Sequence, residues 1–287
     1  MLSGFTIVRN AVLLDYPIGP AIQSLLTVCD EVVVNVGRSA DETRDLVSAI
    51  GDPRVRILES EWDLSRGGAT LARETDRALA ACRGSWGLYV QADEVLHETG
   101  AAILRERIQA WDGDPRVEGL LVDYAHFYGD FDTIATNRHW YRREVRALRL
   151  GGAVRSYGDA QGFRVGPGAR RIQARATGAL MCHYGWARPP ASLGRKHAAF
   201  KTLFGEDVAK LDRREAAPEL EWTPGLRPFT GAHPRVARDW IAARRGTGTT
   251  PVLRPRLRVG DLRYYVSAAI ERLTGARVFE YRNYVLV

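Results

Sequence analysis

Two adjacent carboxylates stand directly after a stretch that predicts a buried strand. Residues 86–90 form a short apolar, aromatic-rich run, and Gln91, Ala92, Asp93 and Glu94 follow it. In open α/β sheets, ligands bind beyond the carboxyl ends of the strands. Paired carboxylates at that edge suit a hard divalent cation that in turn holds a phosphate. A solvated acidic turn is the alternative interpretation of the same residues.

Polar residues also end two earlier strand-like runs, at residues 4–8 and 31–36. In a parallel sheet these ends share an edge with Asp93, where they could hold the base and ribose of a nucleotide. Arg66 precedes a Gly-Gly pair at a predicted helix start and would add a cation near phosphates. The sequence has no GxGxxG motif after the first strand and no GxxxxGK[ST] motif, which disfavours dinucleotide and P-loop binding. The other residues expected to contact the nucleotide are Thr6, Val8, Arg9, Asn35, Gly37, Gln91 and Ala92.

Strand-like and helix-like stretches alternate with short connections through the first hundred residues. This alternation predicts right-handed crossovers and an α/β fold with a doubly wound, mostly parallel sheet. Two longer strands, expected at residues 117–128 and 139–150, have no helix between them and predict antiparallel members. The earlier expected strands are 4–8, 31–36, 54–58 and 86–90, and the expected helices are 17–27, 41–50, 69–81 and 98–111.

The pair Pro189-Pro190 marks the clearest boundary in the chain. We expect a nucleotide-binding and catalytic domain over residues 1–188 and a smaller, mainly helical extension over 189–287. Helices are expected near 192–211 and 261–273, with a Pro- and Arg-rich irregular stretch at 217–258 between them. A strand-like tail at 278–287 could pair across a homodimer.

Composition indicates a globular, reduced protein. The chain has 287 residues, of which 45% are hydrophobic and 26% charged, enough for a full α/β core. No apolar run approaches the ~20 residues of a membrane span, and the amino terminus lacks a signal-peptide core. Cys29, Cys82 and Cys182 form no CxxC pair, which fits reduced thiols and a cytoplasmic location.

Charge is distributed unevenly along the chain. Residues 1–100 hold 9 Lys and Arg against 15 Asp and Glu, whereas the remainder holds 32 against 19. Arginine carries nearly all of the positive charge and suits contact with phosphates. The basic carboxyl-terminal half could contact a phosphorylated substrate or the inner face of an anionic membrane, and a genome-wide bias towards arginine is the alternative explanation.

Three segments together resemble the nucleotide-sugar-binding half of family 2 glycosyltransferases with the GT-A fold. They are Phe-Thr-Ile-Val-Arg-Asn at 5–10, Glu-Val-Val-Val-Asn-Val-Gly-Arg-Ser-Ala-Asp-Glu-Thr at 31–43, and Gly-Ser-Trp-Gly-Leu-Tyr-Val-Gln-Ala-Asp-Glu-Val at 84–95. Two later segments, at 156–163 and 183–189, are similar to a bacterial branch of that family. The family's Asp-x-Asp motif falls on Gln91-Ala92-Asp93, so the first aspartate is missing.

The resemblance implies inverting transfer from a nucleoside-diphosphate sugar, a UDP-sugar ahead of a GDP-sugar, to a hydroxyl of a saccharide or lipid-linked glycan. It implies Mn²⁺ or Mg²⁺ held by Asp93, Glu94 and His183, although His183 could equally be a packed histidine. Asp159 is the expected base that removes the acceptor proton, with an ordinary turn aspartate as the alternative. The expected acceptor contacts are Asp123, His126 and Tyr128, in a stretch that an ordinary half-buried strand would also explain.

Two other functions fit parts of the sequence. A nucleotidyltransferase would use a similar sheet and metal, with Arg9 near the triphosphate. A non-catalytic basic module would bind a membrane surface or polyanion through its carboxyl-terminal part. Nucleic acid is not an expected partner, because the aromatic residues are not interleaved with the basic ones in a known RNA-binding motif.

Overall fold

The computed structural model of the chain describes residues 1–204, 220, 222–247, 259–275, 277–278 and 280–287. Its strands are β1 Leu2–Val8, β2 Glu31–Gly37, β3 Val55–Ser60, β4 Trp86–Tyr89, β5 Glu94–Leu96, β6 Gly119–Tyr128, β7 Thr133–Ala135, β8 Arg143–Arg149, β9 Val154–Tyr157, β10 Gly162–Val165, β11 Arg170–Trp186, β12 Leu226–Pro228 and β13 Tyr284–Leu286. Its helices are α1 Ile18–Leu26, α2 Thr43–Ser48, α3 Ala69–Ala80, α4 Glu98–Trp111, α5 Pro190–Leu203, α6 Arg238–Ala242 and α7 Leu262–Thr274. Short 3₁₀ turns lie at η1 Leu64–Arg66, η3 Arg235–Ala237 and η4 Val259–Asp261.

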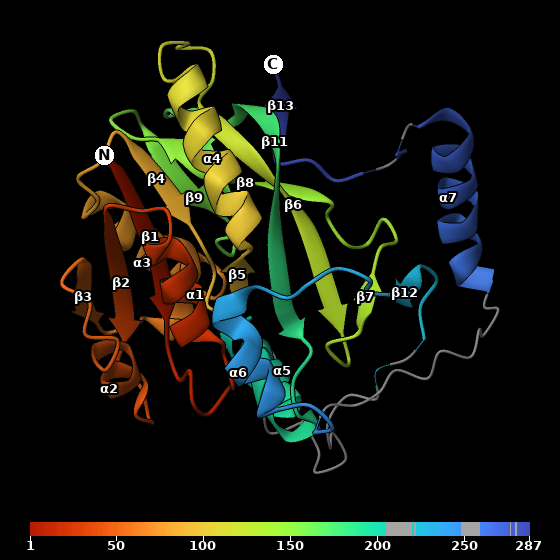
Figure 1. Cartoon of the computed structure of the whole chain (residues 1–287), viewed down its shortest axis with the longest axis horizontal. Helices are drawn as coiled ribbons and strands as arrows, with labels where there is room; N and C mark the ends of the chain where they lie inside the picture. Colours follow the sequence, from red (N-terminus) through yellow and green to blue (C-terminus); the bar gives the residue numbers. More distant parts are fainter. Residues whose placement is uncertain (205–219, 221, 248–258, 276, 279) are drawn as a thin grey trace.

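One twisted sheet organises the chain, with strand order β3-β2-β1-β4-β8-β6-β11-β10-β9 (Figure 1). Strands β1 to β4 pair in parallel, and so do β6 and β11. Strand β8 runs antiparallel between β4 and β6. The predicted α/β class, a mostly parallel sheet with antiparallel members, is therefore confirmed.

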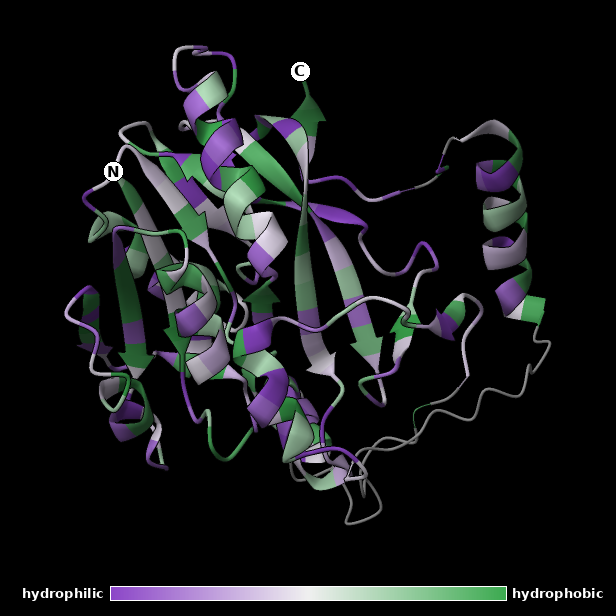
Figure 2. Cartoon of the chain, viewed as in Figure 1, coloured by the Kyte–Doolittle hydropathy of each residue, from purple (hydrophilic) through white to green (hydrophobic). Residues whose placement is uncertain are grey.

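Helices cover both faces of the parallel part of the sheet. Helices α1, α2 and α4 pack on one face and share an apolar core with Val32, Val34 and Leu88. Helix α3 packs on the other face, where Ala78 and Leu79 contact residues of β1 and β2. All seven residues of β2 are buried, and Figure 2 shows this strand coloured mostly as hydrophobic, as expected of a parallel strand covered on both sides.

The carboxyl-terminal part contains helices, as predicted, and also returns to the sheet. Strand β13 pairs in parallel with β11, with Tyr284 opposite Ile172. Tyr284 is buried in the core on the α3 face. The tail suggested for a dimer contact thus adds a strand to the chain's own sheet. The expected helix at 192–211 is seen as α5, and its residues beyond 204 lie outside the described part of the chain, as does much of the stretch 217–258.

Two features that the sequence analysis did not predict position the site. Strand β11 is long, and its last residues reach the edge where β1 and β4 end. The hairpin β9–β10 brings a loop to the same edge.

Within the described residues, no helix is both long and apolar enough to span a bilayer.

Candidate active site

A cavity of about 680 Å³ opens at the carboxyl ends of β1 and β4. Apolar and aromatic side chains such as Tyr16, Trp62, Tyr89 and Trp186 form much of its wall. Charged residues reach it from the strand ends, the β9–β10 loop and helix α5. The predicted site residues that line it are Val8, Arg9, Gln91, Ala92, Asp93, Asp159 and His183.

Asp93 is surrounded by positive or protonatable groups. Its Oδ2 accepts a hydrogen bond of 2.8 Å from Lys196 Nζ and lies 3.6 Å from His183 Nε2 and 3.8 Å from the Arg188 guanidinium. Burial alone would raise the pKa of Asp93, but the charges of Lys196, His183 and Arg188 outweigh it and hold that pKa well below its usual value. Asp93 is therefore ionised and already paired.

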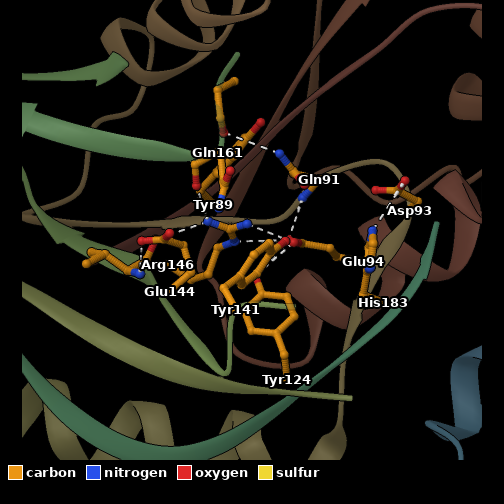
Figure 3. Close-up of polar contacts among 12 residues, drawn as sticks. Tyr89, Gln91, Asp93, Glu94, Tyr124, Tyr141, Glu144, Arg146, Gln161 and His183 are labelled. Carbon is orange, nitrogen blue, oxygen red and sulfur yellow. Dashed lines mark hydrogen bonds and ion pairs between the residues drawn. The ribbon is translucent and has the colours of Figure 1, made fainter. Parts of the chain in front are cut away.

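Glu94 points away from Asp93 into the interior (Figure 3). It forms a bidentate pair with Arg146, with N–O distances of 2.8 and 3.0 Å, and both side chains are completely buried. Tyr124 also donates its hydroxyl to Glu94 at 2.8 Å. This carboxylate, expected as a metal ligand, is thus used to neutralise a buried arginine 52 positions away in the chain.

The residues present do not fit the Mn²⁺ or Mg²⁺ site that the sequence analysis expected. Hard cations of this kind need several oxygen ligands. Of the two carboxylates expected to bind the metal, Asp93 lines the cavity and Glu94 does not, and Lys196 and Arg188 already neutralise the charge of Asp93. In the described part of the chain, no cluster of three or more His, Cys, Asp or Glu residues is placed to hold a metal ion.

Asp159 lies at the tip of the β9–β10 hairpin and lines the cavity. Gly158 and Ala160 on either side of it both have positive φ, of 65° each, so the loop turns sharply here. Gln91 Nε2 donates to the carbonyl of Ala160 at 3.3 Å, and Arg146 donates to the carbonyl of Gln161 at 2.9 Å. These bonds tie the loop to the segment that follows β4 and to β8.

His183 connects the cavity to a second histidine behind it. Its Nδ1 lies 2.9 Å from Nδ1 of His126, whose Nε2 lies 2.7 Å from the carbonyl oxygen of Tyr141. Because a neutral imidazole donates from one nitrogen only, His126 Nε2–H donates to Tyr141, and its Nδ1 accepts from His183. Burial holds the pKa of His126 well below its usual value, which favours this neutral form. His126 thus orients His183 and does not line the cavity itself.

The structure places several other predicted residues away from the cavity. Thr6 is fully buried inside β1. Asn35 is also fully buried, and its amide donates to Glu74 and accepts from Ser60. Their burial within the sheet prevents direct contact with a nucleotide, a correction to the expectation from the strand ends. Gly37 does not line the cavity itself, but it leaves room for Trp62, which does. A Cβ at residue 37 would lie only 2.5 Å from Nε1 of Trp62.

The remaining predicted contacts are held by protein partners. Arg66 is exposed and pairs with Asp63 at 2.8 Å. Asp123 pairs with Arg143 at 2.5 Å. Tyr128 is buried and does not line the cavity; its ring is tilted against that of Trp186, which does, with centroids 6.1 Å apart.

The main site residue that sequence reasoning missed is Lys196 on α5. Burial lowers the pKa of Lys196 to about 8, although Asp93 raises it. A compositional signal was available: of 41 basic residues only three are lysines, and two of them, Lys196 and Lys201, line the cavity. Arg188, which is buried behind Asp93, could not be singled out in this way, because arginine is common throughout the chain.

No protein-family model matches the chain. Over 105 residues it is 35% identical to the succinoglycan biosynthesis protein ExoO of Rhizobium meliloti (strain 1021), a match that covers 36% of this chain and 29% of that protein. The chain therefore spans less than a third of this relative's length.

Several solved structures share part of the fold. Residues 1–349 of S. aureus TarS, in complex with UDP-GlcNAc, match with a TM-score of 0.36 and 19% identity over 45% of this chain and 35% of that one. Glucosyl-3-phosphoglycerate synthase from Mycobacterium tuberculosis, in complex with Mn²⁺, UDP-Glc and phosphoglyceric acid, matches with a TM-score of 0.29 and 16% identity over 44% of each chain. A mycobacterial protein matches with a TM-score of 0.38 and 15% identity over 72% of this chain and 76% of that one.

Proposed function

We propose that the chain is a glycosyltransferase that moves a sugar from a nucleoside-diphosphate sugar to a hydroxyl group. The observation that carries this proposal is the cavity at the carboxyl ends of β1 and β4, which combines an aromatic wall, basic side chains and the carboxylate of Asp159. Such an edge of an α/β sheet is where ligands bind. The partial match to a protein named for succinoglycan biosynthesis supports the same reaction class.

In this proposal Asp159 is the general base of an inverting transfer. The acceptor oxygen attacks the anomeric carbon and forms the new glycosidic bond, while its proton passes to the Asp159 carboxylate. The bond from the anomeric carbon to the diphosphate oxygen breaks, and its electron pair leaves with the diphosphate. A positioned carboxylate contributes typically ~10²–10⁴-fold to such a proton transfer. Because the residues present do not fit Mn²⁺ or Mg²⁺, the transfer in this proposal uses the chain's own side chains alone.

Within this proposal, we expect the donor to be a UDP-sugar first and a GDP-sugar second. Arg9, Val8 and Trp62, whose ring packs against Gly37, would lie near the nucleotide. The acceptor is a hydroxyl of a saccharide or a lipid-linked glycan. A glycan on a lipid would bring the enzyme to the inner face of a membrane, which the basic carboxyl-terminal half favours.

A thermal-shift panel tests the donor class directly. UDP, GDP, CDP and dTDP are each added to the whole chain, with EDTA and with Mn²⁺. A ligand at ~100 Kd should stabilise the fold by roughly 2.7 kcal/mol, and UDP is expected to give the largest shift. UTP serves as the comparison for a nucleotidyltransferase. If none of the diphosphates shifts the unfolding temperature in either condition, the proposed function is wrong.

A further inference from the structure

The ammonium group of Lys196 is fixed on the wall of the cavity. Its Nζ donates to Asp93 Oδ2 at 2.8 Å and to the carbonyl of Gly185 at 3.1 Å. The rings of Tyr16 and Phe200 lie 5.6 and 5.7 Å from it. An ammonium has three N–H donors, so a ligand oxygen in the cavity can also be bound. The side chain is only 13% exposed, which weakens competition from water.

A second cation lies behind the same carboxylate. Arg188 is fully buried, donates to the carbonyls of Leu14 and Tyr184, and places its guanidinium 3.8 Å from Asp93 Oδ2. One carboxylate thus faces two permanent or near-permanent positive charges. Arg9 and Lys201 add further positive charge to the cavity wall. The pair Lys196–Arg188 therefore leaves a positive surplus beside Asp93, which a bound anion would neutralise.

We propose that Lys196, backed by Arg188, binds the diphosphate of the donor and takes the place of a divalent cation, while Asp93 holds the ammonium in position. This inference rests on the proposed function, since it concerns the diphosphate of the same donor. A compact ammonium is a good point charge for phosphate oxygens. The same charge stabilises the diphosphate as it leaves with the electron pair of the broken glycosidic bond. Donor binding then needs no divalent metal.

Isothermal titration with UDP, on the whole chain, tests this directly. The wild type is expected to bind UDP with the same Kd in EDTA and in Mn²⁺. Lys196→Gln should raise that Kd about tenfold or more, which corresponds to ~1.4 kcal/mol or more of binding free energy. Its Kd for uridine, which has no phosphate, should stay at the wild-type value. Arg171→Gln removes the same charge from an exposed position outside the cavity lining and should change neither Kd.

Asp93→Asn distinguishes the two alternative roles of this carboxylate, which are to bind a metal ion or to position Lys196. If Asp93 binds a metal that holds the donor, this variant loses UDP binding in Mn²⁺. If Asp93 positions Lys196, the variant still binds UDP in EDTA, because the amide oxygen can still accept from the ammonium. Thermal unfolding of each variant shows whether it is folded.

Three results would overturn the inference and leave the proposed function standing: UDP binding that requires Mn²⁺, unchanged UDP binding by Lys196→Gln, or equal weakening of UDP and uridine. Should UDP be inactive and GDP selected by the thermal-shift panel, GDP and guanosine replace UDP and uridine in the same design. A folded wild type that binds no diphosphate in either buffer contradicts the proposed function itself.

Discussion

Asp159 combines an exposed carboxylate with a loop that other residues hold in place. Gln91 and Arg146 both donate to carbonyls of this loop, so the position of the carboxylate depends on the end of β4 and on a buried ion pair. A base must lie within hydrogen-bond reach of the proton it removes. The loop is therefore fixed before the acceptor arrives.

Asp159→Asn should retain donor binding and lose transfer. Asparagine has nearly the same shape but cannot take a proton, so kcat should fall by ~10²–10⁴-fold. The Kd for UDP should stay within about twofold of the wild-type value, since the substitution leaves the basic side chains in place. Asp130→Asn, at a loop aspartate that does not line the cavity, is the matched control. Full turnover by Asp159→Asn would remove this residue from the mechanism.

Neither cation beside Asp93 was predicted from the sequence, and the reason is distance along the chain. Lys196 lies 103 positions after Asp93, on a helix that returns to the sheet edge. Local patterns identified the carboxylate but not its partner. The same holds for Glu94, whose pairing with Arg146 across β5 and β8 no local pattern reveals.

At the scale of elements, the alternation of the first hundred residues predicted the structure well. Apolar runs such as 31–36 and amphipathic stretches such as 69–81 appear as β2 and α3 with nearly the expected bounds. The later strands were predicted less completely. Strand β11 mixes exposed and buried positions along 17 residues, and its pairing with β13 joins segments over a hundred residues apart. Such pairings depend on tertiary contacts that periodicity does not contain.

Glu144 on β8 connects the sheet to the tail. Its carboxylate accepts from Asn283 Nδ2 and from the backbone of Val145, each at 2.9 Å. Burial raises the pKa of Glu144, only partly offset by Arg146 and these hydrogen bonds. The folded state therefore binds this proton more tightly than the unfolded state. Glu144 contributes stability at low pH, and that contribution is lost as the pH rises from about 4.5, the unfolded value, through the raised folded value.

Glu144→Gln should remove this component of the pH dependence. The difference in unfolding free energy between wild type and variant should change in favour of the variant as the pH rises above 4.5. Urea unfolding at several pH values up to 7 would measure it, with Glu106→Gln on the exposed side of α4 as control. Parallel curves for wild type and Glu144→Gln would contradict the prediction.

At the scale of the whole molecule, charge and an apolar helix face are the two features that support the proposed contact with an anionic membrane. The residues after 100 hold 32 Lys and Arg against 19 Asp and Glu. Figure 1 shows α7 at the margin of the molecule, beyond β12. Leu262, Val266 and Leu273 share one side of this helix and are 62%, 51% and 84% exposed.

This arrangement favours the peripheral membrane contact proposed above. Arg263 and Arg272 flank the apolar stripe of α7 on either side, the pattern of a helix that lies in the membrane interface. Basic residues near an anionic surface contribute ~1 kcal/mol each, and salt screens that attraction. An enzyme that glycosylates a lipid-linked acceptor would gain from such a contact.

Leu262→Asp should weaken binding to vesicles that contain anionic phosphatidylserine by about tenfold or more. The substitution removes an apolar side chain worth ~1.5–3 kcal/mol when buried and adds a charge that the surface repels. Co-sedimentation with vesicles at low and high salt would measure it, and wild-type binding should fall as salt rises. Leu46→Asp places the same change on α2, where the leucine is 41% exposed, and should have little effect beyond that of its charge. Equal loss in both variants would mean that net charge alone governs binding. Unchanged binding by Leu262→Asp would show that α7 does not face the lipid, since a helix anchored through its apolar stripe cannot accept a carboxylate there.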